Sequence, residues 1–96
     1  MKETWVALRY STSAWRDEDK AMSMIRHVFN DPDKARTMLV GEMVSEAFYL
    51  ESHKREWATN RVNALMEGAR RIAADDGTDR VTIGEDSTLV FEIKKL

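Results

Sequence analysis

Hydrophobic and polar residues alternate in the first predicted element, residues 4–10. Side chains two positions apart lie on the same face of a β-strand. One face would carry Val6, Leu8 and Tyr10, and the other would carry Trp5, Ala7 and Arg9. This period of two residues is typical of a strand that is covered on one side. The pattern therefore predicts a strand at residues 4–10.

The apolar spacing changes after a short run of serine and threonine at residues 11–13. Three acidic residues at positions 17–19 suit the first turn of a helix, because carboxylates complement the positive end of the helix dipole. Four apolar side chains then recur at helical spacing: Met22, Ile25, Val28 and Phe29. We expect a helix at residues 17–29.

Asp31 and Pro32 give the strongest local signal in the chain. Asp31 can accept hydrogen bonds from unpaired backbone N–H groups as an N-cap, and proline is well tolerated at the first helical position. A helical run over residues 32–75 is predicted to follow. Its first apolar seam is Ala35, Leu39, Met43, Ala47 and Leu50, and its second is Ala58, Val62, Leu65, Ala69 and Ile72.

The two seams do not continue into one another across residues 51–61. A straight helix of this length would span about 66 Å, whereas a compact domain of this size has a radius of gyration of about 13 Å. We therefore expect the run to break near residues 52–60 into two antiparallel helices. The alternative is one long helix that a second chain covers.

Two short apolar segments follow Gly77 and predict a β-hairpin over residues 80–93. Val81 and Ile83 would share a face with Leu89, Phe91 and Ile93. An isolated hairpin is marginally stable in water, so we expect strand 4–10 to join it. The predicted fold is a single α+β domain, residues 1–96, in the order β-α-α-α-β-β. A small antiparallel three-stranded sheet would pack on a helical layer.

Composition favours an ordinary folded domain. The chain has 96 residues, of which 43% are hydrophobic and 33% are charged, and its formal net charge is −2. No cysteine is present, so disulfides and thiol chemistry are excluded. Neither a signal-peptide pattern nor an apolar run long enough for a membrane span is found. We expect a cytoplasmic monomer or homodimer without membrane contact.

Catalytic motifs are missing. The four glycines are scattered, and no G-x-S-x-G or phosphate-binding loop occurs. We expect no enzymatic activity, no catalytic residue and no cofactor. On a continuous helix His53 would lie in one stripe with Glu42, Glu46, Tyr49 and Glu56, which makes a metal-dependent hydrolase an alternative. A solvated polar helix face is the favoured explanation of the stripe, and the paired Glu-x-x-His arrangement of di-iron bundles is missing, so we predict no metal. His27 would lie near a helix C-terminus, where an imidazolium would interact favourably with the helix dipole.

Basic side chains suggest a second alternative, nucleic-acid binding. The residues concerned are Lys54, Arg55, Arg61, Arg70 and Arg71. Pairing within the helix competes with this interpretation, because Glu51 precedes Arg55 by four residues and Glu67 precedes Arg71 by four. Lys54 and Arg61 have no such partner.

Three tryptophans suggest protein binding, because tryptophan and arginine are enriched at binding hot spots. Trp57 lies among Lys54, Arg55 and Arg61, and this segment is the first predicted contact surface. The second is Trp5 with Arg9, which would be exposed together with Val90 if helices covered only the other side of the sheet. The function we expect is a small accessory protein that binds and modulates a larger enzyme or complex, as factors of bacteria and mobile genetic elements do.

Overall fold

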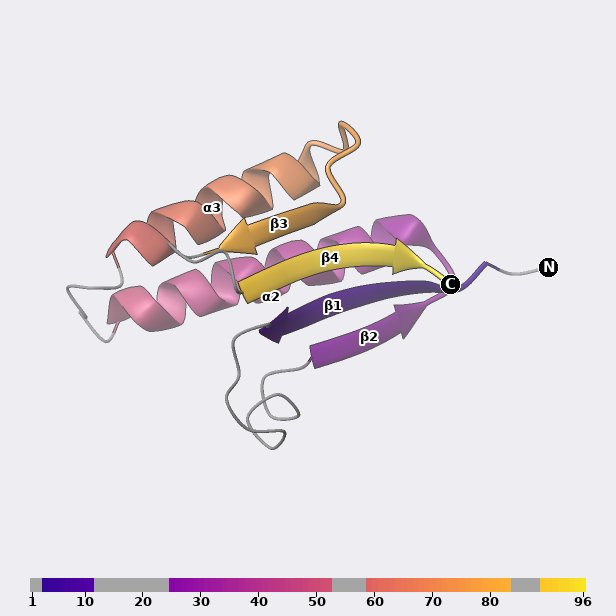
Figure 1. Ribbon diagram of the computed structural model, residues 1–96, viewed down its shortest axis with the longest axis horizontal. Helices are drawn as coiled ribbons and strands as arrows, with labels where there is room; N and C mark the ends of the chain where they lie inside the picture. The colour runs from indigo at the N-terminus through magenta and orange to yellow at the C-terminus, as the bar shows by residue number, and fades with distance from the viewer. Residues whose placement is uncertain (1–2, 12–24, 53–58, 84–88) are drawn as a thin grey trace.

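In the part of the chain that the structure describes, four antiparallel strands and two helices form a two-layer structure (Figure 1). The computed structural model describes residues 3–11, 25–52, 59–83 and 89–96. The elements are β1 (Trp5–Ser11), β2 (Ile25–Phe29), α2 (Pro32–Ser52), α3 (Thr59–Ala73), β3 (Arg80–Ile83) and β4 (Leu89–Lys95). The sheet order is β2-β1-β4-β3. Both helices lie side by side, in opposite directions, on one face of this sheet.

The predicted three-stranded sheet with three helices is wrong, because residues 25–29 form a strand where a helix was expected. β2 pairs with β1 in antiparallel register, with Phe29 opposite Trp5 and Ile25 opposite Arg9. A five-residue strand with apolar residues at both ends also fits helical spacing, so periodicity alone does not separate the two. Pairing with a distant strand decides the conformation. The expected helical residues 17–24 lie outside the described residues.

Asp31 begins α2 as the sequence predicts. The backbone N–H of Asp33 donates a hydrogen bond to Asp31 Oδ1 at 2.8 Å, and the N–H of Ala35 donates to the carbonyl oxygen of Asp31 at 3.3 Å. These bonds satisfy donors that the first turn of a helix leaves unpaired.

Asp31→Ala is expected to lower the free energy of unfolding by about 1 kcal/mol, because an N-cap of this kind contributes about that much. Urea unfolding measures the change. Asp31→Asn is the matched control, since its side-chain oxygen still accepts the bond and its stability should stay close to that of the unchanged chain. Equal losses in the two variants would contradict the capping role.

The hydrophobic core fills the space between the two layers. α2 contributes the whole of its predicted seam, Ala35, Leu39, Met43, Ala47 and Leu50. α3 contributes Leu65, Ala69 and Ile72, and the sheet contributes Ala7, Val81, Ile83, Leu89, Phe91 and Ile93. Gly68 is the point of closest approach: a Cβ atom there would lie 2.8 Å from Met43 Cε and 2.8 Å from Val81 Cγ1. The helix pair and β3 therefore meet at a position that accepts no side chain without movement.

Arg36 ties the start of α2 to the turn that follows α3. Its Nη1 donates to the carbonyl oxygen of Ile72 at 2.9 Å, and Nη2 lies 3.0 Å from Asp75 Oδ1 and 3.2 Å from Asp79 Oδ1. A cation is favourable at the C-terminal end of a helix. Asp75 and Gly77 in this turn have positive φ angles of 53° and 98°, which let the chain reverse from α3 into β3.

Candidate protein-interaction surface

The first predicted contact surface falls largely outside the described residues. Lys54, Arg55 and Trp57 belong to residues 53–58, which the structure does not describe. Arg61 lies in the first turn of α3, where its side chain is partly exposed and takes part in an interaction within the chain. The described residues therefore do not assemble this surface.

Trp5 and Arg9, the second predicted surface, lie on the side of the sheet that the helices cover, so the condition for their joint exposure is not met. Trp5 is partly buried and packs on the core, and its Nε1 donates to Glu3 Oε2 at 3.1 Å. Val90 points to the opposite face of β4 and is only 1% exposed. The physical reason is that Ala7 and Phe91 form the apolar centre of the face on which the helices pack.

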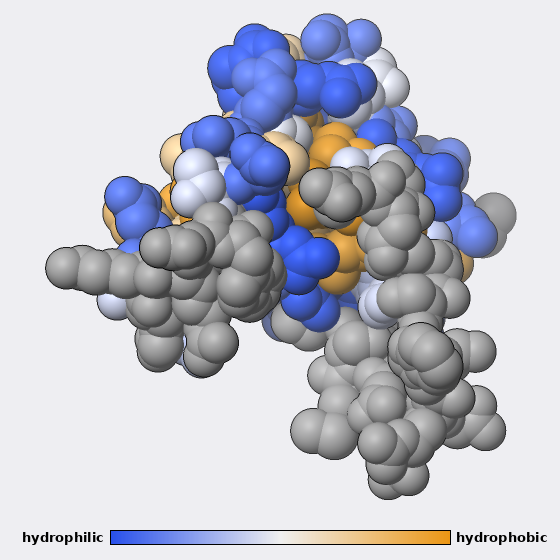
Figure 2. Space-filling model, turned by 60° about the vertical axis from the view of Figure 1, so that its left-hand side comes forward, coloured by the Kyte–Doolittle hydropathy of each residue, from blue (hydrophilic) through white to orange (hydrophobic). Residues whose placement is uncertain are grey.

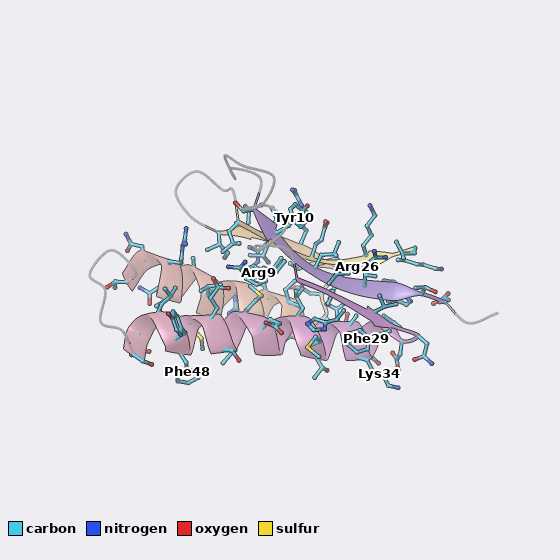
Figure 3. All side chains as sticks on the ribbon, turned by 90° about the horizontal axis from the view of Figure 1, so that it is seen from below. Arg9, Tyr10, Arg26, Phe29, Lys34 and Phe48 are labelled. Carbon is cyan, nitrogen blue, oxygen red and sulfur yellow. The ribbon has the colours of Figure 1, made fainter. Side chains whose placement is uncertain are left out.

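Arg9 makes the strongest polar contact between the sheet and α2 (Figure 3). Its Nε donates to Glu46 Oε2 at 2.8 Å and its Nη2 donates to Glu46 Oε1 at 2.7 Å. Each side chain is 20% exposed, and the guanidinium lies 5.8 Å from the centroid of the Phe91 ring. The hydrogen-bonded Glu46 raises the pKa of Arg9 against the opposing effect of burial. The pair holds the layers together and keeps Arg9 cationic.

His27 lies in β2, so its predicted place at a helix C-terminus is wrong. Its Nε2 is buried and lies 3.4 Å from Glu42 Oε1. The geometry of this contact is not that of a hydrogen bond, so the attraction is electrostatic and depends on protonation of the imidazole. His53 and Glu56 fall outside the described residues. Across residues 3–11, 25–52, 59–83 and 89–96, no three metal-ligating side chains come together.

The basic residues of the nucleic-acid hypothesis do not form one surface among the described residues. Lys54 and Arg55 are not described. The intrahelical pair of α3 is Glu67 with Arg70, not with Arg71 as expected: Arg70 Nε donates to Glu67 Oε2 at 3.0 Å. This contact lowers the pKa of Glu67. Arg71 remains exposed in the last turn of α3.

The face of the sheet that the helices leave uncovered carries polar and apolar side chains. Figure 3 shows Tyr10 and Arg26 on this side. The Tyr10 hydroxyl donates to Glu92 Oε1 at 2.9 Å. Partial burial, together with this bond, raises the pKa of Tyr10. Val6 and Val90 lie on the same face and are each 1% exposed, whereas Val28, opposite Val6 on β2, is 57% exposed.

The outer face of α2 is the surface that the sequence interpretation missed. Thr37, Met38 and Gly41 border a shallow hollow of about 490 Å³, which Phe29, Asp33 and Lys34 complete. Farther along the helix Phe48 is 64% exposed and points away from the sheet (Figure 3). The outward positions between the two ends are all uncharged: Thr37, Met38, Gly41, Ser45, Phe48 and Ser52. We call these six residues and the hollow the α2 outer face.

A helix of a small soluble protein ordinarily places charged residues on its solvent side. α3 follows this rule, with Glu67, Arg70 and Arg71 exposed. α2 differs in where its exposed charges lie: they are confined to its two ends, with Asp33 and Lys34 at the start and Glu51 at the end. The exposed positions between these ends are uncharged. The signal was present in the sequence as Gly41 and Phe48, which lie outside the apolar seam.

Figure 2 views the end of the molecule at which α2 ends and α3 begins. Hydrophobic side chains reach the surface there between hydrophilic ones.

Comparison with protein-family models, with curated proteins and with solved structures found no match for this chain. Within the part of the chain that the structure describes, neither helix is long and apolar enough to cross a bilayer. The function is therefore inferred from the geometry of the chain itself.

Proposed function

We propose that this chain is a small non-enzymatic accessory protein that acts by binding another polypeptide chain, and that the α2 outer face is its contact surface. The observation that supports this proposal is Phe48, which is 64% exposed on the helix that also borders the apolar hollow, two turns beyond Gly41. Aromatic side chains that become buried at an interface often supply much of its binding energy. Modulation of a larger enzyme or complex by such binding is the function that we propose.

A protein partner fits this surface better than a nucleic acid does. Binding to phosphates requires clustered Lys and Arg side chains, but the six residues of the face carry no charge, and Lys34 is the single cation that lines the hollow. The formal net charge of −2 adds no general attraction for a polyanion.

Affinity capture from cells that express the chain tests the proposal, with Phe48→Ser as the disabled bait. Met66→Ser is the matched control: Met66 is also an exposed apolar residue, 44% exposed. It lies on the flank of α3 away from α2, since it is two positions, about 200° around the helix, from Gly68. A specific protein should bind the unchanged chain and the Met66→Ser variant, and should be lost with Phe48→Ser. Loss with both variants, or with neither, would contradict the proposal.

Added salt distinguishes the nucleic-acid alternative in the same experiment. A contact centred on Phe48 should persist, because burial of apolar surface depends little on ionic strength, whereas phosphate binding weakens steeply as counterions are released. Recovery of nucleic acid that salt removes would favour the alternative.

Gly41→Ala is expected to raise the free energy of unfolding of a single copy by about 0.5–1 kcal/mol, the usual difference between glycine and alanine inside a helix. A Cβ atom at this position would have nothing within 4 Å, so no clash offsets the gain. Urea unfolding at low protein concentration measures it. A loss of stability instead would show that the backbone at Gly41 has a role within the monomer.

A further inference from the structure

We propose that a second copy of this chain occupies the α2 outer face, with the two α2 helices antiparallel about a twofold axis near residues 42–43. The inference rests on the proposed function for the position of the contact surface, and it assigns that surface to a second copy of the chain. It is carried by three features: a protruding side chain and a hollow on one helix face, opposite charges at the two ends of that face, and a glycine that the monomer does not need.

The protrusion and the hollow are spaced so that a twofold axis brings them together. Two antiparallel copies whose axis lies midway between Glu42 and Met43 place residue 48 of one copy opposite residue 37 of the other, because these two positions are equally far from the axis. Phe48 of each copy then enters the hollow bordered by Thr37, Met38 and Gly41 of the other. The same operation fills both hollows at once, as a symmetric interface requires.

The ends of the face are also complementary in charge. The same axis places Lys34 of one copy at the level of Glu51 of the other, because these two positions are also equally far from it. Both side chains belong to exposed residues, and neither forms an ion pair within the described part of the chain. Two such pairs would flank the uncharged centre and fix the antiparallel orientation, which is the usual contribution of charges at an interface rim.

Gly41 supplies the close approach. Glycine weakens the middle of a helix, and among the described residues nothing beyond the helix's own nearby backbone lies within 4 Å of the place that a Cβ atom would take. An aromatic ring from a second copy could use that space. Substitution by alanine is therefore expected to have opposite effects, stabilising one copy while weakening the association of two.

The size of the face indicates a reversible dimer. A helix of 21 residues is about 31 Å long, so one helix face is smaller than the roughly 800 Å² per partner of a standard interface. We expect dissociation in the micromolar range, which makes the oligomeric state measurable by dilution.

Sedimentation velocity over a wide range of concentration tests the inference on the full chain. The unchanged chain should pass from monomer to dimer as concentration rises. Phe48→Ser should raise the dissociation constant by at least about tenfold, and Gly41→Ala should raise it by a smaller factor. Met66→Ser, on the opposite flank of α3, should leave the constant unchanged.

A charge exchange identifies the orientation. Lys34→Glu and Glu51→Lys should each raise the dissociation constant, by roughly tenfold through two repulsive contacts, and the double variant should restore it. Both substitutions interact favourably with the dipole of α2, because Lys34→Glu places an anion near the helix N-terminus and Glu51→Lys places a cation near the C-terminus. Circular dichroism should therefore show an intact fold in all three variants.

A monomer at every concentration would overturn the inference, as would a dimer that neither Phe48→Ser nor the charge exchange affects. The proposed function fails separately. If the chain stays monomeric but a different protein is captured and lost with Phe48→Ser, the proposed function stands and the second copy is excluded. If neither self-association nor capture responds to Phe48→Ser, both proposals are refuted.

Discussion

Replacing Glu46 by alanine is expected to lower the free energy of unfolding by about 3 kcal/mol, because the substitution leaves the guanidinium of Arg9 between the layers without its bidentate acceptor. Both side chains are 20% exposed, so water can replace Glu46 only partly. In urea unfolding the loss should appear as a lower midpoint concentration, with no change in the m-value, the dependence of the free energy of unfolding on urea concentration.

Glu67→Ala provides the comparison. Glu67 also holds an arginine, Arg70, but the two side chains are 55% and 68% exposed, and such surface pairs contribute only about 0.5 kcal/mol or less. If both alanine substitutions caused the same small loss, burial of the Arg9–Glu46 pair would not matter to stability.

The double variant Arg9→Met with Glu46→Met tests whether the stability loss of Glu46→Ala comes from the uncompensated charge of Arg9. Removal of both charges leaves no uncompensated ion, and methionine can pack on the ring of Phe91, so the double variant should lose less than Glu46→Ala alone. A double variant as unstable as the sum of the two single losses would indicate that the two residues act independently.

Gly68→Ala is expected to lower the free energy of unfolding by about 2 kcal/mol, within the range for overpacked cores. The new Cβ atom would lie 2.8 Å from Val81 Cγ1, on a strand, and 2.8 Å from the end of the flexible Met43 side chain. Met43 can move, but the β-branched Val81 has few rotamers to choose from.

Combining Gly68→Ala with Val81→Ala tests this explanation. The second substitution removes the methyl group that the first one meets, so the double variant should lose less than the sum of the single losses. Gly41→Ala is the opposite control on the neighbouring helix, because there a Cβ atom meets nothing. Additive losses would mean that the close approach at Gly68 does not cause the instability.

Local and strongly periodic features of this fold could be predicted from sequence. Asp31 and Pro32 are adjacent and act within one helical turn, so no distant residue is needed to interpret them. The buried seam of α2 repeats through the helix, and all five of its predicted members are buried. Signals of this kind depend on spacing alone.

β2 could not be predicted in the same way. Its five residues satisfy a helical and a strand pattern equally, and pairing with β1, more than ten residues away, decides between them. That choice also removed His27 from the helix end and placed it against Glu42. The uncovered side of the sheet could not be predicted for a related reason, because alternation shows that β1 has two faces but does not show which one the helices cover.

The α2 outer face was not predicted because it is defined by absent features: charged side chains on the outward side of α2 and neighbours around Gly41. Tryptophan and arginine are conspicuous in a sequence and drew attention to residues 54–61. An outward helix face without charge is recognised only after the inward face is known, and a glycine without neighbours is recognised only from coordinates. Gly41 and Phe48 can be recognised as parts of one surface only from their positions in the three-dimensional structure.

The order of strands has a consequence for how the chain folds as it is made. β1 lies in the middle of the sheet, and one of its two neighbours is β4, the last strand of the fold; the N–H of Leu96 even donates to the carbonyl oxygen of Thr4. A ribosome must therefore release residue 95 before the first strand can acquire its second neighbour. Pairings so distant in sequence slow folding. During synthesis the backbone groups on one edge of β1 therefore stay unpaired until β4 is made, and they can pair with incorrect strands in that time.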